Sequence, residues 1–343
     1  MGTRLGEIIT AEVITLGDLS GRAISIDAFN TLYQFLATIR QPDGTPLMDQ
    51  QRRITSHLSG LFYRTVSLLE NGIQPVYVYD GESPKLKAPE VERRRAIREA
   101  AYEEWMSALA EGRTEDALKA AHASSRLTSE MIAESKTLLE ALGVPFVQAP
   151  SEGEALAAQM ARDGVVWASA SQDSDSLLYN SPRLIRNLTI SGRRRVAGSR
   201  GYKTVSPELI DLETNLRSLG ISREQLVDVA ILVGTDYNDR VPGMGPKTAL
   251  RLIREYGRIE KIIEAKAIQI DIPIDEIREI FLKPPRMEVS SLRWGLPDTD
   301  AVCALLCDEH NFSQQRVRSS LTHLIEVMSE RDTSSQSSLT DFF

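Results

Sequence analysis

Two aspartates stand close together directly behind an apolar run. The run and the pair read VVWASASQDSDS, with the carboxylates at Asp173 and Asp175. An aspartate after a strand often forms a turn or caps the next helix, and for an isolated pair this alternative stays open. Two carboxylates at the end of a buried strand are also suitable oxygen ligands for a hard divalent cation. The other acidic residues of the chain decide between these interpretations.

Further acidic residues hold comparable positions. Asp27 ends the apolar run RAISID, and Asp80 ends the run PVYVYD. Glu152 and Glu154 begin a helical pattern in SEGEALAAQM, and Asp236 follows another helical pattern in ILVGTD. For the two glutamates alone, a favourable interaction with the helix dipole is the simpler explanation. Beside the other carboxylates, metal binding is the stronger interpretation.

The chain alternates between strand patterns and helix patterns. Strands are predicted at residues 22–29, 74–80, 144–150, 165–170, 183–188 and 202–206, and helices at 30–40, 54–70, 82–128, 131–143, 151–164 and 207–257. This order predicts an α/β fold with a mainly parallel central sheet and helices on both faces. The active site of such a sheet lies beyond the carboxyl ends of the strands, where the strand order switches. The carboxylates are therefore expected to meet at one edge of the sheet.

Carboxylates gathered in this way repel one another and destabilise the fold unless something neutralises them. A pair of Mg²⁺ ions is an economical solution, because Mg²⁺ prefers oxygen ligands and leaves room for substrate phosphate. Two such ions about 3.5–4 Å apart stabilise the attacking and leaving oxygens of a phosphoryl displacement. The acidic residues therefore predict metal-dependent hydrolysis of phosphodiesters.

The composition is that of a globular chain. It has 343 residues, 42% apolar and 26% charged, enough for a full core in one large domain or two smaller ones. No window of about 18 apolar residues is present, and acids stand where a signal peptide would be basic, so a cytoplasmic location without membrane contact is expected. Cys303, Cys307 and His310 share a helical face that is formally a zinc arrangement. Packing of the cysteines in the core is the favoured interpretation.

The net charge of −8 argues at first against a nucleic-acid partner. The distribution of charge matters more, because basic residues gather at 85–98 and 191–203 while the acids follow apolar strands. Such a chain can hold a polyanion at a metal-loaded acidic centre flanked by basic contacts. For Arg93 to Arg95, which alternate with glutamates, a solvated helix face is an equally good explanation.

The turn VPGMGPKTAL has its own physical argument. Gly243 and Gly245 let backbone N–H groups approach a phosphate, the following helix adds its dipole, and Lys247 supplies a positive charge. An ordinary glycine-rich turn between helices is the alternative. This element is therefore a candidate contact to a nucleic-acid backbone.

Several long motifs carry a family resemblance. SIDAFNTLYQFL, ITSHLSGLFYRT, PVYVYDGESPKLK, QAPSEGEALAAQM, ASQDSDSLLY, AILVGTDYN and GMGPKTAL occur in the order found in the archaeal and eukaryotic flap endonucleases. The chain thus resembles the XPG-type family of structure-specific nucleases over nearly its whole length. The resemblance implies Mg²⁺-dependent removal of 5′ flaps at single/double-strand junctions in lagging-strand maturation and long-patch base excision repair, with 5′–3′ exonuclease activity.

The resemblance also assigns roles to residues. It implies that the metal ligands are Asp27, Asp80, Glu152, Glu154, Asp173, Asp175 and Asp236. It implies that Lys87 and Arg94 contact the scissile phosphate and that Tyr33 stacks on a nucleobase. The glycine turn with Gly243, Gly245 and Lys247 would grip the duplex in a helix–two-turn–helix element and hold K⁺, and Mn²⁺ would substitute for Mg²⁺. The start, MGTRLGEI, departs from the usual eukaryotic pattern, so the role of the N-terminal residues stays open.

The expected organisation is one monomeric nuclease domain over residues 1–330, followed by a flexible tail. Its parts are the first half of the core (1–81), a helical arch (82–128), the core with the acidic motifs (129–205), the helix–two-turn–helix region (206–285) and C-terminal helices (286–330). Residues 331–338 are rich in serine and are expected to be disordered. Gln336, Leu339, Phe342 and Phe343 have the spacing of a sliding-clamp-binding motif, against the alternative of a chance Phe-Phe terminus.

Three alternative functions stay under consideration. A phosphatase with a covalent aspartyl intermediate would use QDSDS but leave the other acids without a role. A catalytically dead, clamp-bound DNA adaptor would not need the full set of carboxylates. Another XPG-type repair endonuclease or a 5′ exonuclease is the main alternative, although the short span between Asp80 and Glu152 disfavours the nucleotide-excision member.

Overall fold

The computed structural model describes residues 3–41, 44–190, 192–195, 202–266, 272–289 and 292–340. The strands are β1 (Glu12–Val13), β2 (Ala23–Asp27), β3 (Gln74–Tyr79), β4 (Phe146–Gln148), β5 (Ala168–Ala170), β6 (Arg183–Arg186), β7 (Gly192–Arg195), β8 (Tyr202–Val205) and β9 (Glu208–Asp211). The α-helices are α1 (Ala28–Thr38), α2 (Ser56–Glu70), α3 (Ala88–Ala110), α4 (Thr114–Ala123), α5 (Ser129–Ala141), α6 (Gly153–Arg162), α7 (Asp175–Leu178), α8 (Leu212–Leu219), α9 (Arg223–Val233), α10 (Pro246–Tyr256), α11 (Ile259–Lys266), α12 (Ile274–Leu282), α13 (Thr299–Cys303) and α14 (Gln314–Thr340). Short 3₁₀ segments are η1 (Arg4–Glu7), η2 (Gly17–Leu19), η3 (Lys85–Lys87) and η4 (Leu188–Ile190), and η5 (Ala304–Glu309) is a π-helix.

A seven-stranded sheet forms the centre of the described structure, with the strand order β1-β9-β6-β5-β2-β3-β4. The pairs β2–β3, β2–β5, β3–β4 and β5–β6 are parallel, and only the β6–β9 and β9–β1 pairs of this sheet are antiparallel. The prediction of a mainly parallel α/β sheet is confirmed. The chain builds outward from β2 through β3 to β4 and then returns to β5 on the other side of β2. The strand order therefore switches between β2 and β5.

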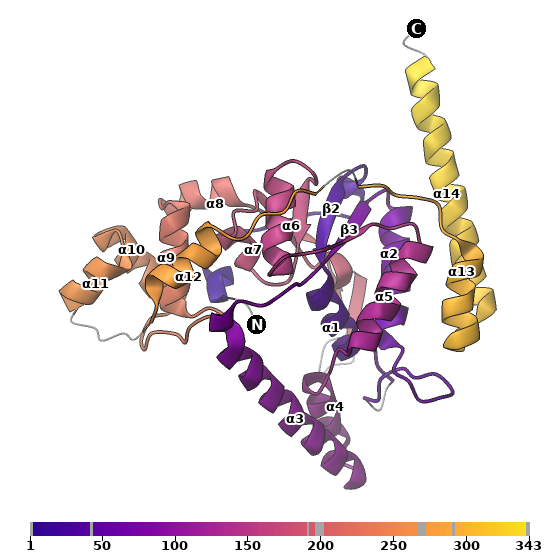
Figure 1. Cartoon of the computed structure of the whole chain (residues 1–343), viewed down its shortest axis with the longest axis horizontal. Helices are drawn as coiled ribbons and strands as arrows, with labels where there is room; N and C mark the ends of the chain where they lie inside the picture. Colours follow the sequence, from indigo (N-terminus) through magenta and orange to yellow (C-terminus); the bar gives the residue numbers. More distant parts are fainter. Residues whose placement is uncertain are drawn as a thin grey trace.

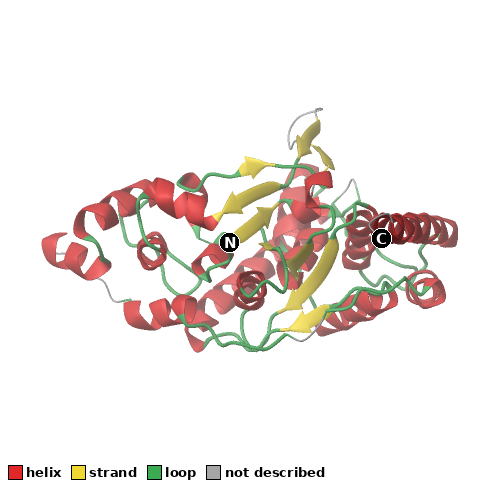
Figure 2. Ribbon diagram, turned by 90° about the horizontal axis from the view of Figure 1, so that it is seen from above, coloured by secondary structure: helices red, strands yellow, loops and turns green. Residues whose placement is uncertain are grey.

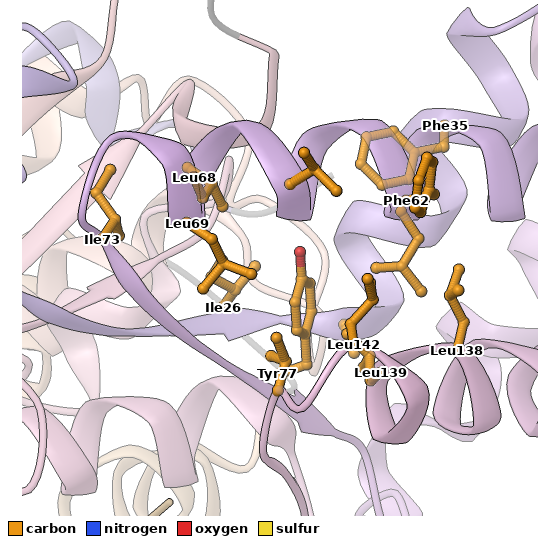
Figure 3. Packing of buried hydrophobic residues seen from close by; sticks show 14 of the residues in the cluster. Ile26, Phe35, Phe62, Leu68, Leu69, Ile73, Tyr77, Leu138, Leu139 and Leu142 are labelled. Carbon is orange, nitrogen blue, oxygen red and sulfur yellow. The ribbon is translucent and has the colours of Figure 1, made fainter. Parts of the chain in front are cut away.

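Helices cover both faces of this sheet, as Figure 2 shows. Alternate residues of a strand point to opposite faces. In β3, Tyr77 and Tyr79 join the apolar cluster that includes α1, α2 and α5, whereas Val76 and Val78 pack with Leu156 of α6. Figure 3 shows the first cluster, in which side chains of α2 and α5 pack with Ile26 of β2 and Tyr77 of β3. Burial on both faces explains why these strands read as continuous apolar runs.

The predicted helical stretch at residues 207–257 is wrong at its beginning. Residues Glu208–Asp211 form β9, which pairs antiparallel with β6 and carries β1 at the sheet edge. Short segments of this composition have no decisive local preference, so pairing with β6 determines their conformation. The β7–β8 pairing is a second feature absent from the prediction, which placed a strand only at residues 202–206.

The predicted helices at residues 82–128 are present as η3, α3 and α4. Figure 1 shows α3 and α4 projecting from the body as a helical hairpin. A small apolar cluster holds the two helices together, and it consists of Trp105, Ala108, Ala117, Ala120 and Ala121. The hairpin thus has a core of its own, separate from the core beneath the sheet.

A second helical group, α8 to α12, lies at one end of the molecule (Figure 1). Helix α9 begins with a capping box formed by Ser222 and Gln225. Buried Asp228 of α9 receives two hydrogen bonds from Arg278 of α12, at 2.7 and 2.8 Å, and one from the backbone N–H of Ile259 at 3.3 Å. These charged hydrogen bonds join three helices around one carboxylate.

The C-terminal segment differs from expectation. Residues 331–338 were expected to be disordered, but α14 continues as helix to Thr340 and extends away from the body in Figure 1. Its first half is anchored by Val317, Leu321 and Leu324, which are buried. Once a helix is nucleated, each further residue adds a hydrogen bond at little cost, and serine and glutamine do not prevent this. None of the described helices is long and apolar enough to cross a membrane.

Candidate active site

The structure brings the predicted carboxylates together in one cleft of about 340 Å³. We call it the acidic cleft; its carboxylates are Asp27, Asp80, Glu152, Glu154, Asp173, Asp175 and Asp236. Tyr33, Lys87 and Arg94 also line it, so all residues predicted to bind metal, to contact the scissile phosphate or to stack on a base lie here. A larger cavity of about 480 Å³ between residues 84–86 and the end of α12 shares only Glu152 with this set. The acidic cleft, and not the larger cavity, therefore holds the residues predicted to carry out the reaction.

Strand ends position the first two carboxylates. Asp27 is the last residue of β2, and its Oδ1 caps α1 by accepting from the backbone N–H of Asn30 at 2.9 Å. Asp80 follows β3, and its Oδ1 accepts from the backbone N–H of Gly153 at 2.6 Å. A Cβ atom on Gly153 would lie only 2.7 Å from the same oxygen, so any larger residue here would displace the Asp80 carboxylate.

The Asp173 and Asp175 pair stands beyond β5, on the other side of the switch point. Asn30 of α1 donates from Nδ2 to Oδ2 of Asp173 at 3.2 Å. The hydroxyl of Ser171 donates to Oε1 of Glu154 at 2.5 Å. Donors from neighbouring strand ends therefore orient the carboxylates, and neither Asn30 nor Ser171 was predicted from the sequence.

Burial and mutual repulsion raise the pKa values of several of these groups. Burial, with the Asp80 charge, raises the pKa of Asp27 well above its usual range. Burial also raises the pKa of Glu154, with Asp175 adding to the effect. It raises the pKa of Asp175 to about 6, and the nearby Asp173 charge contributes. The ionised forms are thus disfavoured without a compensating cation.

Two basic side chains from η3 and α3 supply part of that compensation. The Lys87 ammonium hydrogen-bonds Glu152 and lies 3.4 Å from Asp236, and Arg94 Nη2 lies 2.5 Å from Asp236. Burial opposes the charged form of Lys87, but Glu152 raises the Lys87 pKa on balance. Arg94 also pairs with Glu90 one helical turn earlier, at 2.6 Å. The α3–α4 hairpin is therefore tied to the carboxylates by ion pairs.

Tyr33 of α1 faces the same hairpin. The guanidinium of Arg98 lies 4.8 Å from the centre of the Tyr33 ring, at cation–π distance. Arg98 lines the acidic cleft but was not among the predicted residues. Its position four residues after Arg94 on a helix was the available signal, because residues at this spacing share a face.

The glycine turn lies outside the acidic cleft. It joins α9 to α10, where Gly245 is the N-cap residue of α10 and Lys247 is exposed. Gly243 has φ +77°, and a Cβ atom on either glycine would meet no other atom within 4 Å. The space beside both glycines is therefore open in the described structure.

The remaining predicted residues have other surroundings. His310 lies 3.2 Å from both Asp49 and Glu134 and is buried among them, which does not support its zinc arrangement with Cys303 and Cys307. In α14, the backbone of Gln336 and of Leu339 is helical. Phe342 and Phe343 lie outside the described residues.

The residues of the acidic cleft fit a hard divalent cation in their chemistry. All their candidate ligand atoms are carboxylate oxygens, the preferred donors for Mg²⁺, and the pKa values of Asp27 and Glu154, raised chiefly by burial, are consistent with a site that a cation would stabilise. Among the described residues, however, no three His, Cys, Asp or Glu side chains are arranged as the ligands of one metal ion. Lys87 and Arg94 instead pair with the carboxylates.

Comparison with known proteins agrees with these observations. The XPG N-terminal domain matches residues 5–101, and the XPG I-region matches residues 143–236. Flap endonuclease 1 of Caldivirga maquilingensis is 52% identical over 333 residues, covering 95% of this chain and 95% of the relative. That of Pyrococcus furiosus is 49% identical over 348 residues, covering 100% of this chain and 99% of the relative.

Solved structures give the same result. Flap endonuclease-1 from Methanococcus jannaschii has a TM-score of 0.76 at 40% identity, covering 96% of this chain and 100% of the solved one. The catalytic core of Rad2 in complex with DNA substrate has a TM-score of 0.72 at 24% identity, covering 94% and 100%, and shows a common fold. From its full-length relatives and its acidic cleft, the chain belongs to the flap endonuclease 1 family of XPG-type nucleases.

Proposed function

We propose that the chain is a structure-specific 5′ flap endonuclease that hydrolyses phosphodiester bonds of branched DNA at single/double-strand junctions. The observation that carries this proposal is the acidic cleft, in which seven carboxylates lie together with the basic side chains of Lys87, Arg94 and Arg98. Family membership supports the reaction class. We further propose 5′–3′ exonuclease activity and roles in lagging-strand maturation and long-patch base excision repair.

We propose two Mg²⁺ ions as cofactors, with Mn²⁺ as a substitute. Asp27, Asp80, Glu152, Glu154, Asp173, Asp175 and Asp236 would hold them. When bound, such ions stabilise negative charge on the phosphate oxygens and make water a stronger nucleophile at neutral pH. The carboxylates of this chain would hold the ions, and burial of Asp27 and Asp175 would keep bulk water from screening the charge.

The basic residues have a separate task in this proposal. Lys87 and Arg94 already approach the carboxylates, so a phosphate that enters the cleft would meet both positive charges beside the acidic cluster. In this proposal Lys87 and Arg94 leave Glu152 and Asp236 and pair with the incoming phosphate. These new ion pairs would position the scissile bond. Tyr33 offers a half-buried ring on which a base adjoining that bond stacks.

Two further contacts complete the proposal. The turn with Gly243, Gly245 and Lys247 would bind a phosphate of the duplex at the N-terminus of α10 and would also hold K⁺. Gln336, Leu339, Phe342 and Phe343 would bind a sliding clamp, placing the enzyme on replicating DNA. We expect a monomeric enzyme in the cytoplasm, associated with the nucleoid through DNA and clamp.

One gel tests the central proposal against its alternatives. End-labelled flap, nicked and single-stranded DNA are each incubated with the protein and either Mg²⁺ or EDTA. Mg²⁺-dependent cutting of the flap substrate at the junction supports the proposal. Cutting only from free or nicked 5′ ends would favour the 5′ exonuclease alternative, and a complete lack of cleavage would favour the adaptor.

A further inference from the structure

The third residue of the chain contacts a carboxylate of the acidic cleft. The backbone N–H of Thr3 donates to Oδ1 of Asp175 at 3.1 Å, and the Thr3 hydroxyl donates to the same oxygen. Thr3 is buried, with 6% of its surface exposed, although it stands almost at the beginning of the chain. A side chain 172 positions away in sequence therefore reaches the carboxylate by tertiary folding.

The segment that carries Thr3 is firmly held. Leu5, two residues later, is fully buried in the apolar cluster that α9 and α10 form with η1. Thr10 and Asn215 of α8 form two hydrogen bonds. The backbone N–H of Thr10 donates to Oδ1 of Asn215 at 2.8 Å, and Nδ2 of Asn215 donates to the carbonyl oxygen of Thr10 at 3.0 Å. Packing and hydrogen bonds on the C-terminal side thus fix the position of the Thr3 hydroxyl.

The contact distinguishes the two carboxylate oxygens of Asp175. Both Thr3 donors use Oδ1, so neither of them occupies Oδ2 of Asp175. Asp175 lines the acidic cleft and is itself buried, so its side chain has little freedom to turn. Hydrogen bonds from outside a ligand set commonly fix the orientation of the ligating group.

We propose that Thr3 is a positioning residue that orients Asp175 for cation binding through its side-chain hydroxyl. This inference rests on the metal role of Asp175 proposed above. Thr3 itself touches neither substrate nor cation in this proposal and acts through Asp175 alone. Only the hydroxyl contribution depends on the residue type, because the backbone N–H is present whatever side chain stands at position 3.

Substitutions that keep the shape but remove the donor test the proposal. Thr3→Val removes the hydroxyl, Thr3→Ser keeps it, and Thr3→Ala is a second donor-free variant. Thr15→Val is a matched control, because Thr15 makes the same pair of bonds to Asp18 at 2.8 Å on the exposed surface. Binding of Ca²⁺ to each full-length protein is measured by titration calorimetry without DNA, and unfolding temperatures are recorded alongside.

We expect Thr3→Val and Thr3→Ala to bind Ca²⁺ about 10–100-fold more weakly than the wild type, as for other outer hydrogen-bond partners of metal ligands. Thr3→Ser and Thr15→Val should bind like the wild type. The Mg²⁺ concentration that gives half-maximal flap cleavage should rise only in the two donor-free variants.

Several outcomes would overturn the inference. If the wild type binds Ca²⁺ and Thr3→Val binds it equally well, Thr3 has no positioning role while the metal role of Asp175 stands. A loss in Thr3→Val that Thr3→Ser does not rescue, or unfolding of both donor-free variants, would make the contact merely structural. A wild type that binds no Ca²⁺ would overturn the metal role and this inference together.

Discussion

At the scale of single residues, the acidic cleft balances charge in two ways. Burial and repulsion disfavour ionised carboxylates, and Lys87 and Arg94 compensate part of the negative charge directly. A bound divalent cation would compensate the remainder. Neutralising a carboxylate removes negative charge from the cleft, whereas neutralising Lys87 or Arg94 removes positive charge. The two kinds of substitution should therefore affect DNA binding and the cleavage rate differently.

We expect Asp173→Asn to reduce the rate of flap cleavage by more than about a hundredfold, because it removes a metal-ligating charge. DNA binding should stay the same or improve, since less negative charge faces the incoming phosphate. Single-turnover cleavage and equilibrium binding to labelled flap DNA measure the two effects. Asp300→Asn is a suitable control, because the Asp300 side chain is 92% exposed. Turnover at the wild-type level would disprove the metal role of Asp173.

Lys87→Ala and Arg94→Ala should slow single-turnover cleavage by about 10²–10³-fold with a much smaller loss of flap binding, because they act on charge at the reacting phosphate. Arg93→Ala is a matched control. Arg93 and Arg94 both pair with Glu90, but only Arg94 reaches Asp236. Equal losses of rate and binding would instead make the two residues general phosphate contacts, with the salt dependence of binding falling by about one unit each.

At the level of elements, the α3–α4 hairpin and the end of α14 project from the body of the molecule (Figure 1). The α3–α4 hairpin has its own apolar cluster, and its ion pairs fasten it over the acidic cleft. Helix α14 is fixed at its first half, and Arg331 continues the attachment by donating to the carbonyl of Leu69 at 3.0 Å. The described contacts that fix α14 to the body thus extend as far as Arg331.

Deletion of residues 336–343 should abolish stimulation by the sliding clamp and leave cleavage by the enzyme alone unchanged. Burial of three apolar side chains at about 1.5–3 kcal/mol each, less a few kcal/mol for ordering, corresponds to a dissociation constant on the order of micromolar. Binding of the clamp from the same organism is measured by calorimetry for the full chain and the deletion. Ser337→Ala serves as the control. Undiminished clamp binding by the truncated protein would refute the motif.

At the scale of the whole molecule, the cleft couples stability to pH and to metal ions. An acid whose pKa is raised in the folded protein holds more protons folded than unfolded. For Asp175 this window runs from its ordinary pKa of 3.8 to about 6, and its contribution to stability falls as pH rises through that window. Asp27 and Glu154 are shifted in the same direction. Above the pKa of the folded protein, the full loss of stability from ionising these buried acids is present. A bound divalent cation would offset this loss by taking the place of the protons.

We therefore expect Mg²⁺ to raise the unfolding temperature little at pH 5 and markedly more at pH 8. Acids elsewhere whose pKa values are lowered, such as Asp211 and Glu134, also make stability depend on pH. Their effect is the same with and without Mg²⁺, so it cancels when the two unfolding temperatures are subtracted. Unfolding temperatures with and without Mg²⁺, at matched ionic strength, measure the effect. A stabilisation by Mg²⁺ that does not change with pH would contradict this coupling.

The fold class and the seven carboxylates of the acidic cleft follow from the amino-acid sequence. Asp27 and Asp80 follow apolar runs, and the alternation of strands and helices predicts a parallel sheet whose carboxyl ends share one edge. Local pattern is sufficient there, because the direction of a parallel strand fixes where the residue after it stands. The same argument placed Asp173 and Asp175 at this edge.

The donors that contact those carboxylates, the edge strand β9 and the C-terminal part of α14 depend instead on contacts between distant parts of the chain. The Thr3–Asp175 and Lys87–Glu152 contacts join residues 172 and 65 positions apart, and no local pattern encodes such pairs. Segment Glu208–Asp211 became strand β9 through its pairing with β6. Residues 331–338 became helical as a continuation of a helix anchored in the core. In each case the deciding free energy comes from a distant partner or an already formed element, and neither is present in the local sequence.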